Sequence, residues 1–479
     1  MLFNSLEFAI FFPFVCILYF LLPMQMRTPM LLVSSCIFYM AFIPAYIFIL
    51  LLTIVIDYTA GIYLERTHGA VRSVLLWSSI VATCLVLFIF KYFHFFASNF
   101  AGLASLIGWR VTPPALSIIL PVGLSFHTFQ SLSYVIEVYR GHQRAEPNFV
   151  TYATYVMFFP QLVAGPIERP QNLLHQFYEN HVFDYDRVTS GLKRMAWGFF
   201  KKLVVADRLA LYVNDVYAAP QNFNGLQITL GTVFFAYQIY CDFSGYSDIA
   251  IGSARVLGFR LMENFGNPYY SRSISEFWHR WHMSLSTWFR DYVYIPMGGS
   301  RVSAARRYFN LLVTFGVSGL WHGANWTYVA WGLLNGCYLV VALLTTQIRN
   351  RLFGTFGVGE SNRLRFGTRR LSTFAFICAG WVVFRSNNLT DAVYIFSHLW
   401  QNWDFAHIST EQFLLRQMPV AFGGIALLEL GQLLNGRLAV KSFVLSLPTP
   451  LRWAGYATFV LGVVLCGIFR QTQFIYFQF

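Results

Sequence analysis

The chain has 479 residues, of which 56% are hydrophobic and only 11% are charged, and its formal net charge is +13. Because soluble domains carry about 25% charged residues, this composition excludes a soluble globular domain. A mean hydropathy of +0.51 favours instead an integral membrane protein with several spans.

Apolar stretches recur along the chain and predict transmembrane helices, since lipid offers backbone groups no hydrogen-bonding partner outside a helix or a closed barrel. The first stretch is expected to stay in the mature protein, because no Lys or Arg precedes it and no small-residue cleavage site follows. The sequence therefore predicts an all-α polytopic integral membrane protein, a single domain over residues 1–479 with a motif-rich core at about 115–346. The predicted spans are 6–22, 30–42, 46–64, 74–96, 116–138, 228–251, a hairpin over 309–344, 371–384, 419–434 and 454–469.

The span 116–138 and the residues just after it carry many polar side chains. His127, Gln130 and Glu137 lie in "SFHTFQSLSYVIEVYRG" together with Ser131 and Ser133. Such side chains can line a passage or join neighbouring helices by hydrogen bonds. The residues alone leave both interpretations open.

The segment "FFPQLVAGPIERPQ" (158–171) is apolar but contains Pro160, Gly165, Pro166 and Pro170. Prolines at this density stop a helix from crossing a membrane. We therefore expect a bent or re-entrant segment that is shielded by protein or lines a cavity.

A short acyltransferase-like pattern follows in a polar loop. His181 and Asp186 in "HVFDYD" match the H-x-x-x-x-D spacing of glycerolipid acyltransferases. Because no supporting motif accompanies this pattern, we discount it as a catalytic site.

Two aspartates interrupt the predicted span 228–251. Asp242 and Asp248 lie in "YQIYCDFSGYSDIAIG" beside several hydroxyl-bearing side chains. Residues at this spacing point in different directions on a helix, which argues against a paired catalytic site. Structural pairing with arginine or hydroxyl groups and a functional role at membrane depth are the two open interpretations.

The segment "SISEFWHRWHMSLSTWFRDYVYIPMGG" (273–299) is predicted to form one amphipathic helix in the membrane interface. Pro296 and the Gly298–Gly299 pair are expected to end it. Two of its histidines have a spacing that could ligate a metal, but no H-E-x-x-H pattern or nearby cysteine supports zinc, so no metal site is predicted. The apolar stripe comprises Phe277, Trp281, Leu285, Trp288 and Tyr292, and the polar face comprises His279, His282, Ser286 and Arg290.

The stretch "SGLWHGANW" (318–326) places polar residues in the middle of the predicted hairpin. A neutral imidazole is cheaper to bury than a charge and can take or give a proton near neutral pH. Gly316, Gly319 and Gly323 leave room near His322 and Asn325 for a substrate or another backbone. A structural histidine bonded to a carbonyl oxygen is the alternative interpretation.

Arginines gather on both sides of the same hairpin. Residues 349–370 contain six arginines and one acid, Glu360, while Arg301, Arg306 and Arg307 precede the hairpin. A hairpin returns its ends to one side, so both clusters are expected to face the cytoplasm. Topology then explains the net charge without a nucleic-acid partner, and a dedicated site for an anionic ligand is the alternative.

Several of these blocks, taken in chain order, resemble the membrane-bound O-acyltransferase family. They are "FFPQLVAGPIERP", "YCDFSGYSDIAIG", "FWHRWHMSLSTWFRDYVYIPMGG", "SGLWHGANWTYVAWGLLNG" and the terminal "FIYFQF", and "MLFNSLEF" and "SFHTFQSLSYVIEVYRG" extend the match. The chain looks most like the bacterial alginate O-acetyltransferase branch, to which the D-alanyl transfer protein of teichoic acid synthesis is closely related. The resemblance implies a ring of roughly 11–13 helices, with re-entrant and interfacial helices, around a central tunnel and funnel.

The resemblance also implies the site residues. The histidine of the W-H-G block would be catalytic, and here it is His322. The histidine of the R-W-H block, His282, would be the second catalytic histidine, whereas His279 has no counterpart. The residues predicted to position the substrates are Asn325, Trp321, Asp242 and Arg290.

The function implied by the resemblance is transfer of an acetyl group from cytosolic acetyl-CoA across the bacterial inner membrane. An extracytoplasmic SGNH-type partner would receive the group and deliver it to an alginate-like exopolysaccharide. Acetyl-CoA would be a donor substrate, and no cofactor is predicted. Transfer of D-alanyl or another acyl group to a cell-wall polymer is the alternative. A proton-coupled transporter is the alternative from another class, although no inverted repeat is detectable.

Overall fold

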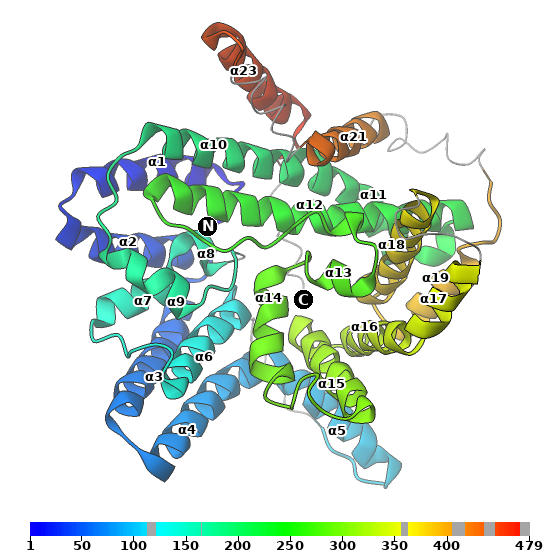
Figure 1. Ribbon diagram of the computed structural model, residues 1–479, viewed down its shortest axis with the longest axis horizontal. Helices are drawn as coiled ribbons and strands as arrows, with labels where there is room; N and C mark the ends of the chain where they lie inside the picture. Colours follow the sequence, from blue (N-terminus) through cyan, green and yellow to red (C-terminus); the bar gives the residue numbers. More distant parts are fainter. Residues whose placement is uncertain (113–120, 164, 356–362, 405–416, 435–445, 470–479) are drawn as a thin grey trace. The chain divides into compact units, whose positions relative to one another are not determined.

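The computed structural model describes residues 1–112, 121–163, 165–355, 363–404, 417–434 and 446–469. Every regular element in these ranges is helical, which confirms the all-α prediction (Figure 1). By its internal contacts the chain separates into two compact units, and each is described by itself. The single domain over 1–479 stays a prediction.

Several helices are long and apolar enough to cross a membrane, and the chain is a polytopic membrane protein as predicted. The candidate spans found among the described residues are Pro44–Arg66, Gly69–Leu106, Trp326–Leu344 and Thr449–Cys466, with Leu6–Leu21 and Met418–Leu434 as shorter apolar helices. The predicted spans 228–251 and 371–384 are helical but are not among these candidates, because polar and charged residues lower their hydropathy. The start of the predicted span 116–138 and the terminal "FIYFQF" lie outside the described residues.

Unit 1 comprises Met1–Met195 and Ile249–Glu263. Within it α3 packs against α4 and α6. One buried polar group joins α3 to α4, since the Asp57 carboxylate accepts hydrogen bonds from Ser79 at 2.6 Å and Thr83 at 3.0 Å. The longer helices are α1 (Leu6–Leu21), α2 (Met24–Met40), α3 (Ile47–Arg66), α4 (Gly69–Leu87), α5 (Phe93–Leu106), α6 (Leu124–Arg140), α7 (Phe149–Met157) and most of α10 (Tyr185–Phe199).

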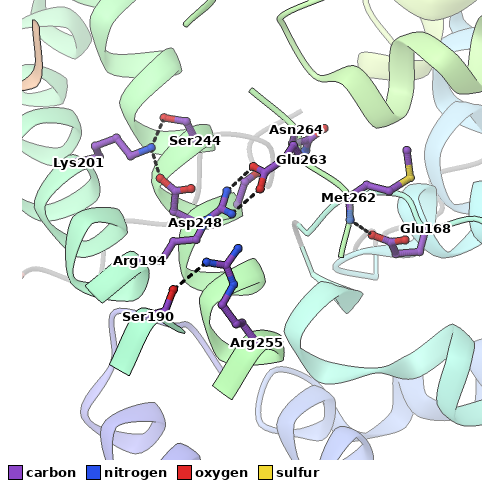
Figure 2. A network of polar contacts seen from close by, with 11 residues as sticks. Glu168, Ser190, Arg194, Lys201, Ser244, Asp248, Arg255, Met262, Glu263 and Asn264 are labelled. Carbon is purple, nitrogen blue, oxygen red and sulfur yellow. Dashed lines mark hydrogen bonds and ion pairs between the residues drawn. The ribbon is translucent and has the colours of Figure 1, made fainter. Parts of the chain in front are cut away.

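The proline-rich segment 158–171 forms no long helix, as expected. Its helical parts are α8 (Phe159–Leu162) and the start of α9 (Pro170–Leu173). Between them the buried Glu168 carboxylate accepts a hydrogen bond from the backbone N–H of Met262 at 2.5 Å (Figure 2). The segment is thus held by a tertiary hydrogen bond to a distant part of the chain and not by the hydrogen bonds of a helix.

Unit 2 comprises Ala196–Asp248 and Asn264–Phe479. It contains the helical hairpin and most of the motif blocks. Within it α15 packs against α16, and α16 packs against α18. Its principal helices are η4 (Phe200–Ala206), α11 (Asp207–Ala218), most of α12 (Gly225–Leu257), α13 (Ile274–Trp278), α14 (Met283–Phe289), η7 (Arg290–Tyr294), α15 (Ala304–His322), α16 (Trp326–Leu344), α17 (Thr346–Thr355), α18 (Arg363–Arg385), α19 (Leu389–His398), α21 (Met418–Leu434) and α23 (Thr449–Cys466).

The prediction of one continuous helix over 273–299 is wrong. The segment divides into α13, α14 and η7, and the break falls at His282, whose backbone is left-handed with φ of 43°. The physical reason is a tertiary hydrogen bond, since the Met283 N–H donates to the Asn264 carbonyl at 3.0 Å instead of continuing a helical pattern. The predicted end is confirmed, because Gly298 and Gly299 have φ of 103° and 56°.

Candidate functional site

The predicted hairpin carries His322 at its turn. α15 ends at His322, and α16 begins at Trp326 after a connection of three residues. Asn325 caps α16, because its side chain accepts a hydrogen bond from the Thr327 N–H at 3.0 Å. Its amide also donates to the Asn387 carbonyl at 3.3 Å. The histidine is therefore held at a helix end rather than on a helix face.

Glycines let the two helices of the hairpin touch backbone to backbone. A Cβ at Gly319 would lie 2.2 Å from the carbonyl oxygen of Tyr328, and one at Gly332 would lie 2.2 Å from that of Phe315. Small residues at such positions allow helices to approach closely in membranes. The hairpin thus fixes the position of His322 through backbone contacts, which have little freedom to shift.

We expect Gly319→Ala to destabilise the protein and Gly316→Ala to leave it nearly unchanged. At Gly316 a Cβ would meet only the Leu333 side chain at 3.3 Å, which can move, and alanine favours a helix by about 0.5–1 kcal/mol. At Gly319 the backbone clash outweighs that gain. Thermal unfolding of both variants in the same detergent measures the difference, and equal midpoints would contradict the packing argument.

Three aromatic rings surround the His322 imidazole. Ring centroids of Trp321, Trp331 and Phe384 lie 5.0, 5.0 and 5.5 Å from that of His322, each in an edge-to-face arrangement. His322 itself is only 5% exposed. An imidazole, which can take or give a proton, is therefore buried among apolar rings, where polar interactions are stronger than in bulk solvent.

The second predicted histidine, His282, lies beside the same tryptophan. Its ring centroid is 6.4 Å from that of Trp321 and 4.5 Å from that of Phe243, which meets it edge-on. His282 is 1% exposed, whereas His279 is exposed. Unit 2 thus brings together His322, His282 and Trp321, three of the predicted site residues.

Asp242 lies in a buried ion-pair cluster. Lys202 Nζ is 2.7 Å from an Asp242 oxygen and 2.9 Å from an Asp207 oxygen, and the three side chains are at most 5% exposed. Asp242 is thus paired with a cation as the structural interpretation predicted, but that cation is Lys202, where an arginine was expected. A role of Asp242 in positioning substrate stays a prediction.

The neighbouring Lys201 pairs with the other aspartate of the motif. Figure 2 shows its ammonium group between the Asp248 carboxylate and the Ser244 hydroxyl, the latter at 2.9 Å. Both lysines lie in "FFKKLVVA", where two adjacent charges stand in an apolar stretch. That contrast is the signal by which the sequence could have indicated buried cations.

The remaining sequence candidates lie elsewhere. Arg290 is exposed on η7 and pairs with Asp291 at 2.8 Å. In unit 1, the buried His127 has its Nε2 atom 3.5 Å from the Thr53 hydroxyl. His181 packs on the Phe259 ring and its Nε2 lies 2.9 Å from the Gln176 carbonyl oxygen, while burial lowers its pKa. These contacts give His181 a local structural role.

No group of three or more His, Cys, Asp or Glu side chains in the described part of the chain is arranged to hold a metal ion. Around the two imidazoles lie aromatic rings, those of Phe243, Trp321, Trp331 and Phe384. The chemistry that this arrangement offers is proton transfer by an imidazole in a dry, aromatic environment.

Comparisons with known proteins point to one family. Residues 140–357 match the membrane-bound O-acyltransferase family. The chain is 39% identical to the probable alginate O-acetylase AlgI of Pseudomonas aeruginosa, over 81% of this chain and 73% of that protein. It is 32% identical to a peptidoglycan O-acetyltransferase of Helicobacter pylori, over 82% and 78%. It is 29% identical to a teichoic acid D-alanyltransferase of Streptococcus thermophilus, over 52% and 63%.

Proposed function

Because the chain belongs to the membrane-bound O-acyltransferase family, we propose that it moves an acetyl group from cytosolic acetyl-CoA across the bacterial inner membrane, for O-acetylation of an extracytoplasmic polysaccharide. That it is a multi-pass membrane acyltransferase follows from the family and from its apolar helices. The donor, the direction and the acceptor are the parts that we propose.

The observation that carries the proposal is the pair of buried imidazoles in contact with one indole. His282 and His322 both lie against Trp321, and both are at most 5% exposed. Acetyl-CoA is confined to the cytoplasm, and its charge and size prevent it from crossing lipid. If the protein transfers only the acetyl group through a buried histidine site, CoA itself does not need to cross the membrane.

In the proposed reaction one imidazole acts as general base. An acceptor hydroxyl gives its proton to His322 while its oxygen attacks the thioester carbonyl, the C–S bond breaks, and the CoA sulfur takes up the proton. His282 helps to hold the reacting groups, and the Trp321 ring lies near both imidazoles. The rings of Trp331 and Phe384 exclude water, which protects the thioester from hydrolysis. Transient attachment of the acetyl group to His322 is the variant of this scheme.

We further propose that an SGNH-type partner outside the membrane takes the acetyl group and places it on an alginate-like exopolysaccharide. Support comes from the alginate O-acetylase and peptidoglycan O-acetyltransferase relatives. The teichoic acid D-alanyltransferase relative supports the second candidate, transfer of a D-alanyl group, less strongly because it matches a smaller part of the chain.

The test is transfer by the purified protein in detergent or in vesicles. Labelled acetyl-CoA is supplied with an alginate oligosaccharide or a candidate partner, and thiol release and label transfer are followed together. A parallel arm supplies a D-alanyl donor. Acetyl transfer with release of thiol supports the proposal, transfer of D-alanyl alone supports the second candidate, and uptake of substrate without thiol release points to a transporter.

A further inference from the structure

The backbone at His282 is held in a conformation that its own sequence does not favour. Its φ of 43° and ψ of 55° are left-handed, a region that non-glycine residues seldom occupy, although histidine, asparagine and aspartate do so more than most. Such conformations persist where surrounding contacts determine them. Left to local preference, the amphipathic pattern of 273–299 favours a continuous helix with His282 beside His279 on its polar face.

Asn264 supplies the contacts that impose the turn. Its carbonyl oxygen accepts from the Met283 N–H at 3.0 Å. Its side-chain oxygen accepts from the Ser284 N–H at 3.3 Å and from the Ser284 hydroxyl at 3.0 Å. On the other side of the histidine, the Gly266 N–H donates to the Arg280 carbonyl at 2.9 Å. Residues on both sides of His282 are thus tied to 264–266.

The same asparagine is joined to the helix that packs on the imidazole. Its amide donates to the Ser247 hydroxyl on α12 at 3.3 Å. About one turn earlier on α12, Phe243 meets the His282 ring edge-on. Asn264 is 1% exposed. One buried side chain therefore links the turn that carries His282 to the helix that supports its ring.

We propose that Asn264 is a positioning residue for acyl transfer, which acts by holding the left-handed turn that directs His282 into the core beside Trp321. The proposal rests on the function proposed above. Without the side chain of Asn264 the bonds to Ser284 and Ser247 are lost and only backbone bonds hold the turn, so the His282 imidazole spends more time turned out beside His279. Asn264 itself touches no reacting group in this scheme.

The test combines kinetics with chemical labelling of histidines in the full-length protein. Diethyl pyrocarbonate modifies accessible imidazoles, and mass spectrometry of the segment that holds both histidines compares buried His282 with exposed His279 as an internal reference. For Asn264→Ala we expect labelling of His282 to rise about fivefold or more relative to His279, and kcat for acetyl transfer to fall roughly 10–100-fold with KM for acetyl-CoA within about twofold. Asn264→Asp keeps the acceptor oxygen and should recover part of both effects.

Asn310 provides the matched control. It is also a buried asparagine of unit 2, and its amide holds a nearby turn by donating to the Met297 and Gly299 carbonyls at 3.2 and 3.1 Å. Asn310→Ala should lower thermal stability by a similar amount while His282 stays protected. If both asparagine variants expose His282 equally, the effect is general loosening and the proposal is wrong.

The other outcomes are also decisive. Full protection of His282 in Asn264→Ala overturns the proposal, whether or not activity falls. Loss of protection with unchanged transfer also overturns it, because His282 then has no part in the reaction. If the wild-type protein transfers no acyl group at all, the proposed function fails, and the labelling still decides whether Asn264 holds the turn.

Discussion

Replacing His322 with alanine is expected to lower kcat for acetyl transfer by about 10²–10⁴-fold, the range that a general acid–base group contributes. The imidazole lies at the end of α15 inside three aromatic rings and is 5% exposed. Water has little access to replace it as a base in that position. His322→Gln, which keeps polarity but not proton transfer near neutral pH, should lose as much.

The control for this prediction is His279→Ala. His279 lies in the same motif block as His282 but is exposed, so its loss should change kcat by less than about twofold. All three variants are compared by thiol release and label transfer after gel filtration has shown equal monodispersity. If His322→Ala keeps more than a tenth of the wild-type rate, His322 is not the base and the proposed reaction must be abandoned.

Replacing Lys202 with methionine is expected to be the most destabilising single change in unit 2. Lys202 is 1% exposed and lies within 2.9 Å of carboxylate oxygens of both Asp207 and Asp242. Removal of one partner from a buried ion pair costs about 3–5 kcal/mol, because the opposite charge stays in a medium of low polarity. Here two carboxylates lose the same cation, so we expect Lys202→Met to unfold or aggregate well below the wild-type temperature.

Two comparisons isolate the effect of the buried charge. Arg272→Met removes one partner of a surface pair, in which Arg272 Nε is 3.7 Å from Glu276 and 48% of the arginine side chain is exposed. Such pairs contribute at most about 1 kcal/mol. Adding Asp242→Asn to Lys202→Met removes one of the two carboxylates that have lost their cation and should restore part of the lost stability. Equal unfolding midpoints for Lys202→Met and Arg272→Met would show that burial does not govern this cluster.

The motif blocks singled out two histidines but did not predict the aromatic rings around them. The W-H-G and R-W-H blocks identified His322 and His282, and the structure brings both onto Trp321. The same blocks gave no indication that Phe243 would contact His282, or that Phe384 would contact His322. These rings come from segments far apart in the chain, and single-sequence periodicity reports only which face of its own helix a residue occupies.

By itself the sequence determined that this is a polytopic helical membrane protein, because hydropathy and the backbone's need for internal hydrogen bonds leave few other solutions. It also determined the hairpin that carries His322, since apolar helices flank a short turn. Only the tertiary structure decided that His282 is buried and His279 exposed. The helical pattern places both on one face, and the hydrogen bonds from residues 283 and 284 to Asn264 break that pattern. Tertiary structure also decided that Lys202 is the cation beside Asp242. A buried charge needs an opposite charge, and the packing determines which one lies close enough.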